Sequence, residues 1–185
     1  TRMIALILPE FNRFFVPDLI KGIQHYADEQ GYKVIIFQSG NQFEAEAEII
    51  KYCLSWVVEG VLISLSDNTS DLNHLQILKD SQIPVVLLDK VLTSTDYPTV
   101  TIDGFAAAYT ATTTLIQKSR KKILGVFGHE NLSITKDRFF GFQQALSDAG
   151  LPVDPEPYLI VNHIQQINRL LAAKTREYLP DGIFF

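Results

Sequence analysis

Cysteine is nearly absent from this 185-residue sequence, which contains one, Cys53, so no internal disulfide can form. The sequence is therefore compatible with a reducing compartment, and we expect the protein in the cytoplasm. No uninterrupted apolar run approaches about 18 residues, so neither a membrane-spanning helix nor a membrane partner is expected. We also expect no secretory leader, because Thr1 is followed within a few residues by a strand-like segment.

An excess of positive charge is missing as well, since the formal net charge is −5. A surface that neutralises phosphates normally contains clustered Lys and Arg. The longest basic cluster, residues 118–122, lies between an expected helix and an expected strand, where cations suit the C-terminus of a helix. We therefore expect that this chain does not bind nucleic acid unaided.

Signatures of catalysis are largely absent. The sequence contains no GxGxxG, GxxxxGK[ST], GxSxG or HExxH motif, and its four histidines have no metal-ligand spacing. His129 and Glu130 form either an acid–base pair or, as we favour, part of a loop that lines a pocket or faces water. Cys53 shares an apolar stripe with Ile49 and Leu54, which favours a core residue over a reactive thiol. We predict no enzymatic activity, no metal and no cofactor.

Short runs rich in β-branched and aliphatic residues are present throughout, separated by longer helical patterns. The runs lie at residues 3–9, 33–39, 60–64, 84–89, 99–103, 122–128, 158–162 and 182–185. Continuous apolar runs of this length are typical of strands buried on both faces, as in a parallel sheet. The sequence therefore predicts the α/β class, with doubly wound parallel sheets.

Helical periodicity occupies most of the intervening segments. The first helix opens with Pro17 in its first turn and ends at Gly31. The second begins at Asn41, with Glu44 three residues later in a capping-box-like pair. Further helices are expected at residues 71–81, 104–118, 136–149 and 163–178.

The link from Asp89 to Thr99 lacks helical periodicity, so two strands are joined without a helix. We expect the chain to pass there from one subdomain, residues 1–102, to a second, residues 103–185. The second subdomain offers only three strands before the sequence stops, and we therefore expect it to be partial.

Polar and aromatic side chains follow the expected strands at their carboxyl ends, the edge at which doubly wound sheets bind ligands. The candidate ligand-binding residues are Phe14, Phe15, Ser64, Asp89, Asp103, Asn131, Ser133 and Arg138. Several have plainer alternatives: the two phenylalanines as core residues, Asp89 as a turn residue, and Asp103 as a helix N-cap.

Arg138 is the strongest of these candidates. We place it in the first turn of a helix, where a cation opposes the helix dipole and needs another reason to be present. A guanidinium there can form forked hydrogen bonds to vicinal hydroxyls or to a carboxylate. The alternative is a salt bridge with Asp137 or Asp103.

Four segments in this order and spacing resemble a known family. They are PVVLLDK, VTIDGFAAAYTATTTLI, RKKILGVFG and DRFFGFQQAL, at residues 84–90, 100–116, 120–128 and 137–146. Together they resemble the regulatory core of LacI/GalR-type transcription repressors, which share the periplasmic-binding-protein type I fold. The resemblance covers essentially the whole chain and implies two subdomains that flank a ligand cleft.

The resemblance also implies partners. In that family a small effector, commonly a sugar or a purine, binds between the subdomains, and an N-terminal helix-turn-helix contacts operator DNA as a homodimer. This chain would then contact DNA only through a headpiece preceding Thr1. Matching the family's pattern, Arg138 is the arginine of an R-x-x-G-F segment, Asp89 the effector-facing aspartate, and Phe14 and Phe15 the aromatic segment.

The sequence departs from the family's pattern at a few positions. Lys90 stands where arginine usually follows the aspartate, and Ile134 stands where a hydroxyl residue often lies four positions before the arginine. Family members also continue beyond the position of Phe185 into further effector-contacting segments, so we expect a truncated core.

We therefore predict the effector-binding and dimerisation core of a LacI/GalR-type transcription regulator that senses a small metabolite, a sugar or sugar derivative, in the cleft between the two subdomains. The alternative is a periplasmic sugar-binding protein of a transport system, which uses the same fold without DNA. An enzyme on this scaffold is disfavoured because the sequence lacks a nucleophile, metal or phosphate-binding signature.

Overall fold

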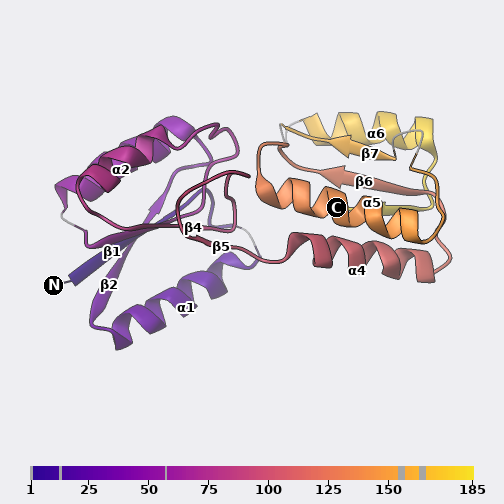
Figure 1. The fold of residues 1–185 in the computed structure, drawn as a ribbon. Coiled ribbons are helices and arrows are strands. Elements are labelled where there is room, and N and C mark those ends of the chain that lie inside the picture. Colours follow the sequence, from indigo (N-terminus) through magenta and orange to yellow (C-terminus); the bar gives the residue numbers. More distant parts are fainter. Residues whose placement is uncertain (1, 13, 57, 154–156, 163–165) are drawn as a thin grey trace. The chain divides into compact units, whose positions relative to one another are not determined.

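The computed structural model describes residues 2–12, 14–56, 58–153, 157–162 and 166–185. The chain forms two compact units, Thr1–Thr101 and Ile102–Phe185, each with its own parallel sheet (Figure 1). The α/β class predicted from the sequence is confirmed. None of the described helices is long and apolar enough to cross a membrane.

The first unit contains a sheet of five strands in the order β2-β1-β3-β4-β5, and all neighbouring pairs are parallel. The strands are β1 (Arg2–Leu8), β2 (Tyr32–Gln38), β3 (Gly60–Ile63), β4 (Val85–Leu88) and β5 (Thr99–Val100). The helices are α1 (Val16–Glu29), α2 (Phe43–Ser55), the short 3-10 helix η1 (Asn73–Leu75) and α3 (Gln76–Asp80). Helices α1 and α2 cover opposite faces of the sheet (Figure 1).

Strand β1 shows why both faces of this sheet must be covered by helices. Ala5 and Ile7 point to the face packed by α2, whereas Leu6 and Leu8 point to the face packed by α1. All four side chains are almost fully buried. The strand is therefore apolar from Met3 to Leu8, as the sequence predicted, and Cys53 lies in the α2-side core, as predicted.

The second unit contains a sheet of three parallel strands in the order β7-β6-β8. Its elements are α4 (Gly104–Gln117), β6 (Ile123–Phe127), α5 (Ser133–Asp148), β7 (Tyr158–Ile160), α6 (Ile167–Tyr178) and β8 (Gly182–Phe184). Helices α4 and α5 pack on one face and α6 on the other (Figure 1). Part of the helix expected at residues 163–178 lies outside the described residues, because 163–165 are not described.

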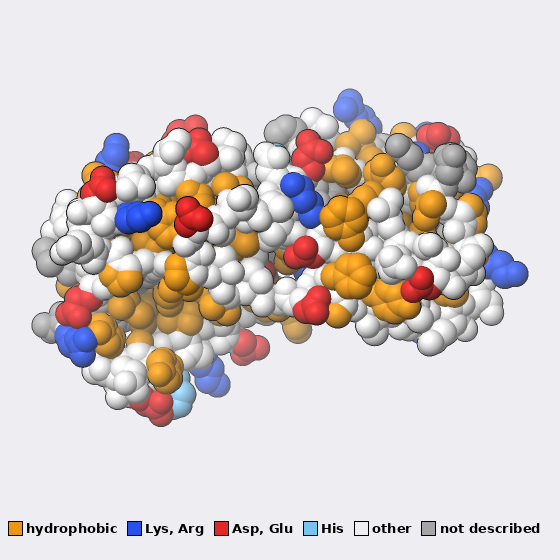
Figure 2. Space-filling view, in the orientation of Figure 1, with side chains coloured by type: hydrophobic (Ala, Val, Ile, Leu, Met, Phe, Trp, Pro, Cys, Tyr) orange, Lys and Arg blue, Asp and Glu red, His pale blue; other side chains and the backbone are white. Residues whose placement is uncertain are grey.

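Aromatic rings fill the core beneath α4 and α5. The ring of Phe127 lies 5.4 to 5.6 Å, centroid to centroid, from the rings of Phe139, Phe142 and Phe184. Phe142 is fully buried, which confirms the apolar face predicted for this helix. Figure 2 shows that hydrophobic side chains also gather on the outer surface over these helices, where Phe105 and Phe140 are exposed.

Three details of the expected elements are wrong. The strand expected at residues 99–103 is reduced to the exposed pair Thr99–Val100, because it is the edge of the sheet and pairs only with β4. The helix expected at 71–81 is divided into η1 and the one-and-a-half turns of α3. The helix expected from residue 136 begins at Ser133, because the carbonyl of Leu132 already accepts hydrogen bonds from the Thr135 and Lys136 amides.

The predicted capping box of α2 is also wrong. Asn41 lies before the helix in a left-handed conformation, with φ of 60°, and its side chain binds Asp67 instead of the helix. The first turn of α2 is capped from another segment, since Asn68 Oδ1 accepts a hydrogen bond from the Phe43 amide at 3.0 Å. Helix α2 therefore depends on the loop that follows β3.

Candidate functional site

In the first unit, polar side chains gather where β2, β3 and β4 end. They are Ser39 and Asn41 after β2, Ser64, Ser66 and Asp67 after β3, and Asp89 and Lys90 after β4. Because these strands are parallel, their carboxyl ends lie at one edge of the sheet, the edge that binds ligands in open α/β folds. We call this set the first polar edge.

Two predicted residues belong to the first polar edge. Ser64 is buried, and its amide donates to the carbonyl of Ile7 at 2.9 Å, which continues the β1–β3 ladder. Asp89 is half-buried and takes a left-handed conformation with φ of 54°, which an aspartate tolerates better than most residues. Its backbone amide donates to the carbonyl of Val100 at 3.0 Å, so the position of Asp89 is set by β5.

Phe14 and Phe15 lie between β1 and the start of α1, and they are not core residues. Phe14 is fully exposed, and Phe15 is 45% exposed at the N-cap position of α1. Val16, the next residue, takes the core position at the helix start. The alternative that both phenylalanines are buried is therefore wrong, and two rings are presented to the surroundings beside the carboxyl end of β1.

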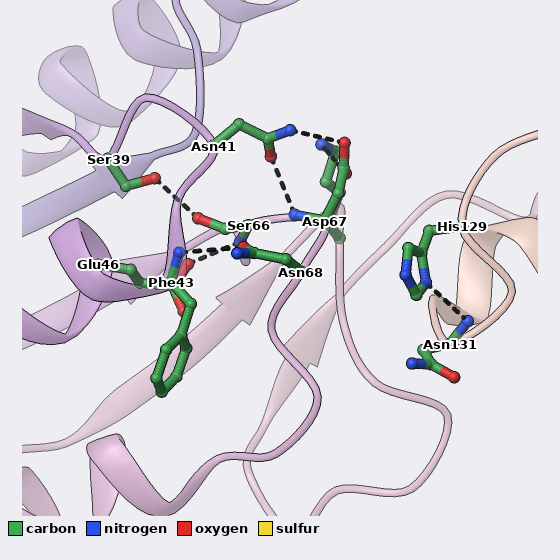
Figure 3. Close-up of polar contacts among 10 residues, drawn as sticks. Ser39, Asn41, Phe43, Glu46, Ser66, Asp67, Asn68, His129 and Asn131 are labelled. Atoms are coloured by element: carbon green, nitrogen blue, oxygen red, sulfur yellow. Dashed lines mark hydrogen bonds and ion pairs between the residues drawn. The ribbon is translucent and has the colours of Figure 1, made fainter. Parts of the chain in front are cut away.

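Asn41, Asp67 and Lys90 form a connected polar group that the sequence analysis missed (Figure 3 shows the Asn41–Asp67 bonds). The Asn41 side chain donates to Asp67 Oδ2 at 2.7 Å and accepts from the Asp67 amide at 2.9 Å. Lys90 forms an ion pair with the same carboxylate, and its side chain is 14% exposed. The available signal was the run Ser66-Asp67-Asn68 directly after β3, which is typical of a strand-end turn.

In the second unit, Asp103, Asn131, Ser133 and Arg138 lie before or within the starts of α4 and α5. Asp103 is the N-cap of α4, and its Oδ1 accepts from the Ala106 amide at 2.8 Å. The predicted capping role is thereby confirmed. Ser133 opens α5 and is half-buried, whereas Asn131 is exposed in the preceding loop.

The loop after β6 also holds His129. Its Nδ1 accepts a hydrogen bond from the Asn131 amide at 3.3 Å, and Figure 3 shows the two residues side by side. This hydrogen bond occupies Nδ1 within the loop that follows β6, so His129 stabilises the conformation of that loop. The arrangement favours the loop alternative for His129 over an acid–base pair with Glu130.

Arg138 lies in the second turn of α5, because the helix begins five residues earlier at Ser133. Its predicted place in the first turn is wrong, and the conflict with the helix dipole is correspondingly small. The side chain is half-buried, and its Cγ would lie 3.6 Å from a Cβ built on Gly104. Among the residues that the structure describes, Arg138 forms no ion pair, so the predicted alternative of a salt bridge with Asp137 or Asp103 is not found.

Two α/β units with polar side chains at the carboxyl edges of parallel sheets define the class of ligand-binding α/β proteins. A family model described as periplasmic binding proteins and sugar binding domain of LacI family matches residues 1–181. The chain belongs to this family, as the resemblance implied.

Two curated relatives are transcription regulators. Catabolite control protein A of Priestia megaterium is 31% identical over 191 residues, which cover 100% of this chain and 56% of that protein. The HTH-type transcriptional regulator RegA of Clostridium saccharobutylicum is 27% identical over 157 residues, covering 84% of this chain and 47% of that protein. The chain thus spans about half the length of the curated relatives it matches.

Solved structures of transcription regulators superpose on this chain. The transcription regulator CcpA of Lactococcus lactis superposes with a TM-score of 0.87 and 27% sequence identity, covering 99% of this chain and 67% of that one. The Cra transcriptional dual regulator of Pseudomonas putida, in complex with fructose 1-phosphate, has a TM-score of 0.83 at 19% identity, with 99% of this chain and 68% of that one covered. The latter likeness shows the fold alone.

Proposed function

We propose that this chain is the effector-binding part of a LacI-type transcription regulator and binds a small molecule of the sugar or purine class that offers oxygen or nitrogen acceptors. The observation that carries the proposal is Arg138, a half-buried guanidinium near the start of α5 with no ion pair among the described residues. A charge that is partly shielded from water gains from a charge-assisted hydrogen bond, so a ligand with oxygen acceptors suits it.

The chemistry of the surrounding candidates fits such a ligand. A guanidinium presents a planar fork of donors that suits vicinal hydroxyls or a carboxylate. Asp89 offers carboxylate acceptors for ligand hydroxyls, and the exposed ring of Phe14 or Phe15 suits the C–H face of a sugar or the plane of a base.

Regulation follows from differential binding. A ligand that makes its full set of contacts in one conformation shifts the population toward that conformation. A coupling of about 1 to 3 kcal/mol between the ligand site and DNA is sufficient for regulation. We infer that operator DNA is bound through a segment outside this chain, that the regulator acts as a homodimer in the cytoplasm, and that it is not an enzyme.

The regulators found among the relatives support this proposal over a transport function. The family description covers both classes of protein, but the named relatives described above are transcription regulators. At 31% identity over the whole chain, catabolite control protein A is the kind of relative that a regulator would have.

A thermal-shift screen of sugars, sugar phosphates and purines on the protein in its full natural length tests the proposal. Fructose 1-phosphate and cellobiose belong in the screen, because two proteins of this fold are known as complexes with them. A ligand at about 100 times its dissociation constant adds about 2.7 kcal/mol to the free energy of unfolding.

Arg138→Ala is the informative variant, and Arg169→Ala, which removes an exposed arginine on α6, is its matched control. We expect a ligand that stabilises the wild type and the Arg169 variant and fails to stabilise the Arg138 variant. Equal stabilisation of all three would show that Arg138 does not contact the ligand. No stabilisation by any compound would remove the support for this class of effector.

A further inference from the structure

A buried carboxylate lies directly behind the first polar edge, and no part of the ligand chemistry above uses it. Glu46, in the first turns of α2, is fully buried. Its Oε2 accepts from the Ser66 amide at 2.6 Å, and its Oε1 accepts from the Thr69 hydroxyl at 3.0 Å (Figure 3 shows Glu46 beside Ser66). Burying a carboxylate away from water is strongly unfavourable. These charge-assisted hydrogen bonds offset that cost at Glu46.

His74 completes the surroundings of this carboxylate. Its Nε2 lies 2.9 Å from Glu46 Oε1, and its side chain is 6% exposed. The nitrogen is poorly aligned for a hydrogen bond, so the contact is electrostatic when the imidazole is charged. The ring also packs edge-on against Phe43, with centroids 5.1 Å apart, which fixes η1 against the start of α2.

The segment that Glu46 holds, residues 64–69, is the part of the chain that connects the three strand ends. Ser66 Oγ lies 3.0 Å from Ser39 Oγ after β2, and the Leu65 amide donates to the carbonyl of Lys90 after β4 at 3.1 Å. These cross-connections leave the segment little freedom to move by itself.

The same segment carries the half-buried Asp67 of the first polar edge and the exposed Asn68. Asp67 exchanges two hydrogen bonds with Asn41 and forms the ion pair with Lys90. Asn68 caps the Phe43 amide at the start of α2. Glu46 therefore holds the backbone on both sides of Asp67. The Glu46 carboxylate accepts hydrogen bonds from Ser66, the residue before Asp67, and from Thr69, the second residue after it.

We propose that Glu46 is a positioning residue of the ligand-binding edge, which holds residues 64–69 so that Ser64 and Asp67 keep fixed places beside Asp89 and Lys90. The effect of Glu46 on ligand binding rests on the proposed function. The effect of Glu46 on residues 64–69 concerns the protein without ligand and is tested separately.

Amide hydrogen exchange of Glu46→Gln in the full-length protein is the test. Glutamine has nearly the same shape but is a weaker, uncharged acceptor, so the segment opens more often. Exchange at the Ser66 and Asp67 amides is expected to accelerate about tenfold, while the amides of Ala5 and Leu6 in β1 keep their rates. A role in overall stability alone would accelerate all of these amides by one factor.

Glu48→Gln is the matched control, since Glu48 lies two residues further along the same helix, is exposed and accepts a hydrogen bond from the Tyr52 hydroxyl at 3.1 Å. It is expected to change none of these exchange rates. Unchanged rates at Ser66 and Asp67 in Glu46→Gln, or the same acceleration in β1, would overturn the inference.

Binding of fructose 1-phosphate and of cellobiose provides the second measurement. If the wild type binds either probe, Glu46→Gln is expected to raise its dissociation constant about fivefold to tenfold and Glu48→Gln to leave it unchanged. Unchanged affinity in Glu46→Gln would overturn the role in ligand binding. If the wild type binds neither probe, the proposed function fails for these two sugars, and amide exchange still decides whether Glu46 holds the segment.

Discussion

Cys53 shows at the scale of one residue how burial controls chemistry. Its side chain is fully buried between α2 and the sheet, and this burial raises the pKa of the thiol to about 11. The thiolate is the reactive form of cysteine, so the thiol is inert in the folded protein at neutral pH. The helical spacing of the apolar residues around Cys53 was sufficient to predict this, because a stripe on a helix faces the core.

The raised pKa of Cys53 also predicts how stability changes with pH. The ordinary value is 9.0, so between about pH 9 and pH 11 the unfolded chain releases the thiol proton while the folded protein retains it. The contribution of the thiol is complete below pH 9 and is lost as pH rises, by up to about 2 to 3 kcal/mol. Urea unfolding at pH 8 and pH 10.5 measures the change in the free energy of unfolding. Between these pH values Cys53→Ala should lose less of this free energy than the wild type. Equal losses in both proteins would contradict the assignment.

Arg138 and Asn41 show what single-residue reasoning could not supply. The type of residue was informative, because an arginine near the start of an amphipathic helix and an asparagine after a strand are both typical of functional edges. Their exact environment depends on Leu132 accepting the first helical hydrogen bonds and on Asp67 binding the asparagine across 26 positions of sequence. Such contacts arise only when distant segments meet, so no local pattern contains them.

Helices α4 and α5 pack closely against each other, and Gly141 explains why. A Cβ built on Gly141 would lie 2.2 Å from the carbonyl oxygen of Phe105 and 3.0 Å from the Tyr109 amide nitrogen. Only a residue without a side chain lets the backbones approach this closely. The family pattern placed Gly141 between Arg138 and Phe142, and the packing gives the physical reason for a glycine there.

Gly141→Ala is therefore expected to destabilise the second unit by about 1 to 3 kcal/mol or more, because backbone and not a flexible side chain must move. Gly22→Ala is the control: Gly22 lies within α1 with nothing within 4 Å of the added methyl group. That substitution should stabilise the protein by about 0.5 to 1 kcal/mol. Urea unfolding of the two variants measures both changes, and a neutral Gly141→Ala would contradict the packing.

Most elements were predicted well, and the two poorest predictions concern β5 and the segment that forms η1 and α3. The strands β1 and β2 and helices α1 and α4 lie within a residue or two of their expected positions, because burial on one or two faces imposes a period over many residues. Strand β5 has two residues at a sheet edge, and α3 has five. Elements this short are set by pairing with neighbours, so their sequence does not define them.

At the scale of the whole molecule, the chain divides between Thr101 and Ile102 into two units with separate cores. The sequence indicated two doubly wound units from the missing helix between Asp89 and Thr99, and four segments in register indicated the family. The assignment of the candidate residues to a ligand remains a prediction, because the ligand chemistry depends on several side chains acting together. Asp89 and Arg138 carry opposite charges, so substitutions at these two positions test this most sharply.

Calorimetric titration of a ligand identified in the thermal-shift screen, into the wild type, Asp89→Asn and Arg138→Gln, tests the central claim most directly. Asparagine tolerates the left-handed conformation at position 89, so that variant removes charge without straining the backbone. We predict that each substitution weakens binding by about tenfold to a hundredfold, the cost of removing one charge-assisted hydrogen-bonding partner. Unchanged affinity in either variant would contradict the claim that the substituted residue contacts the ligand.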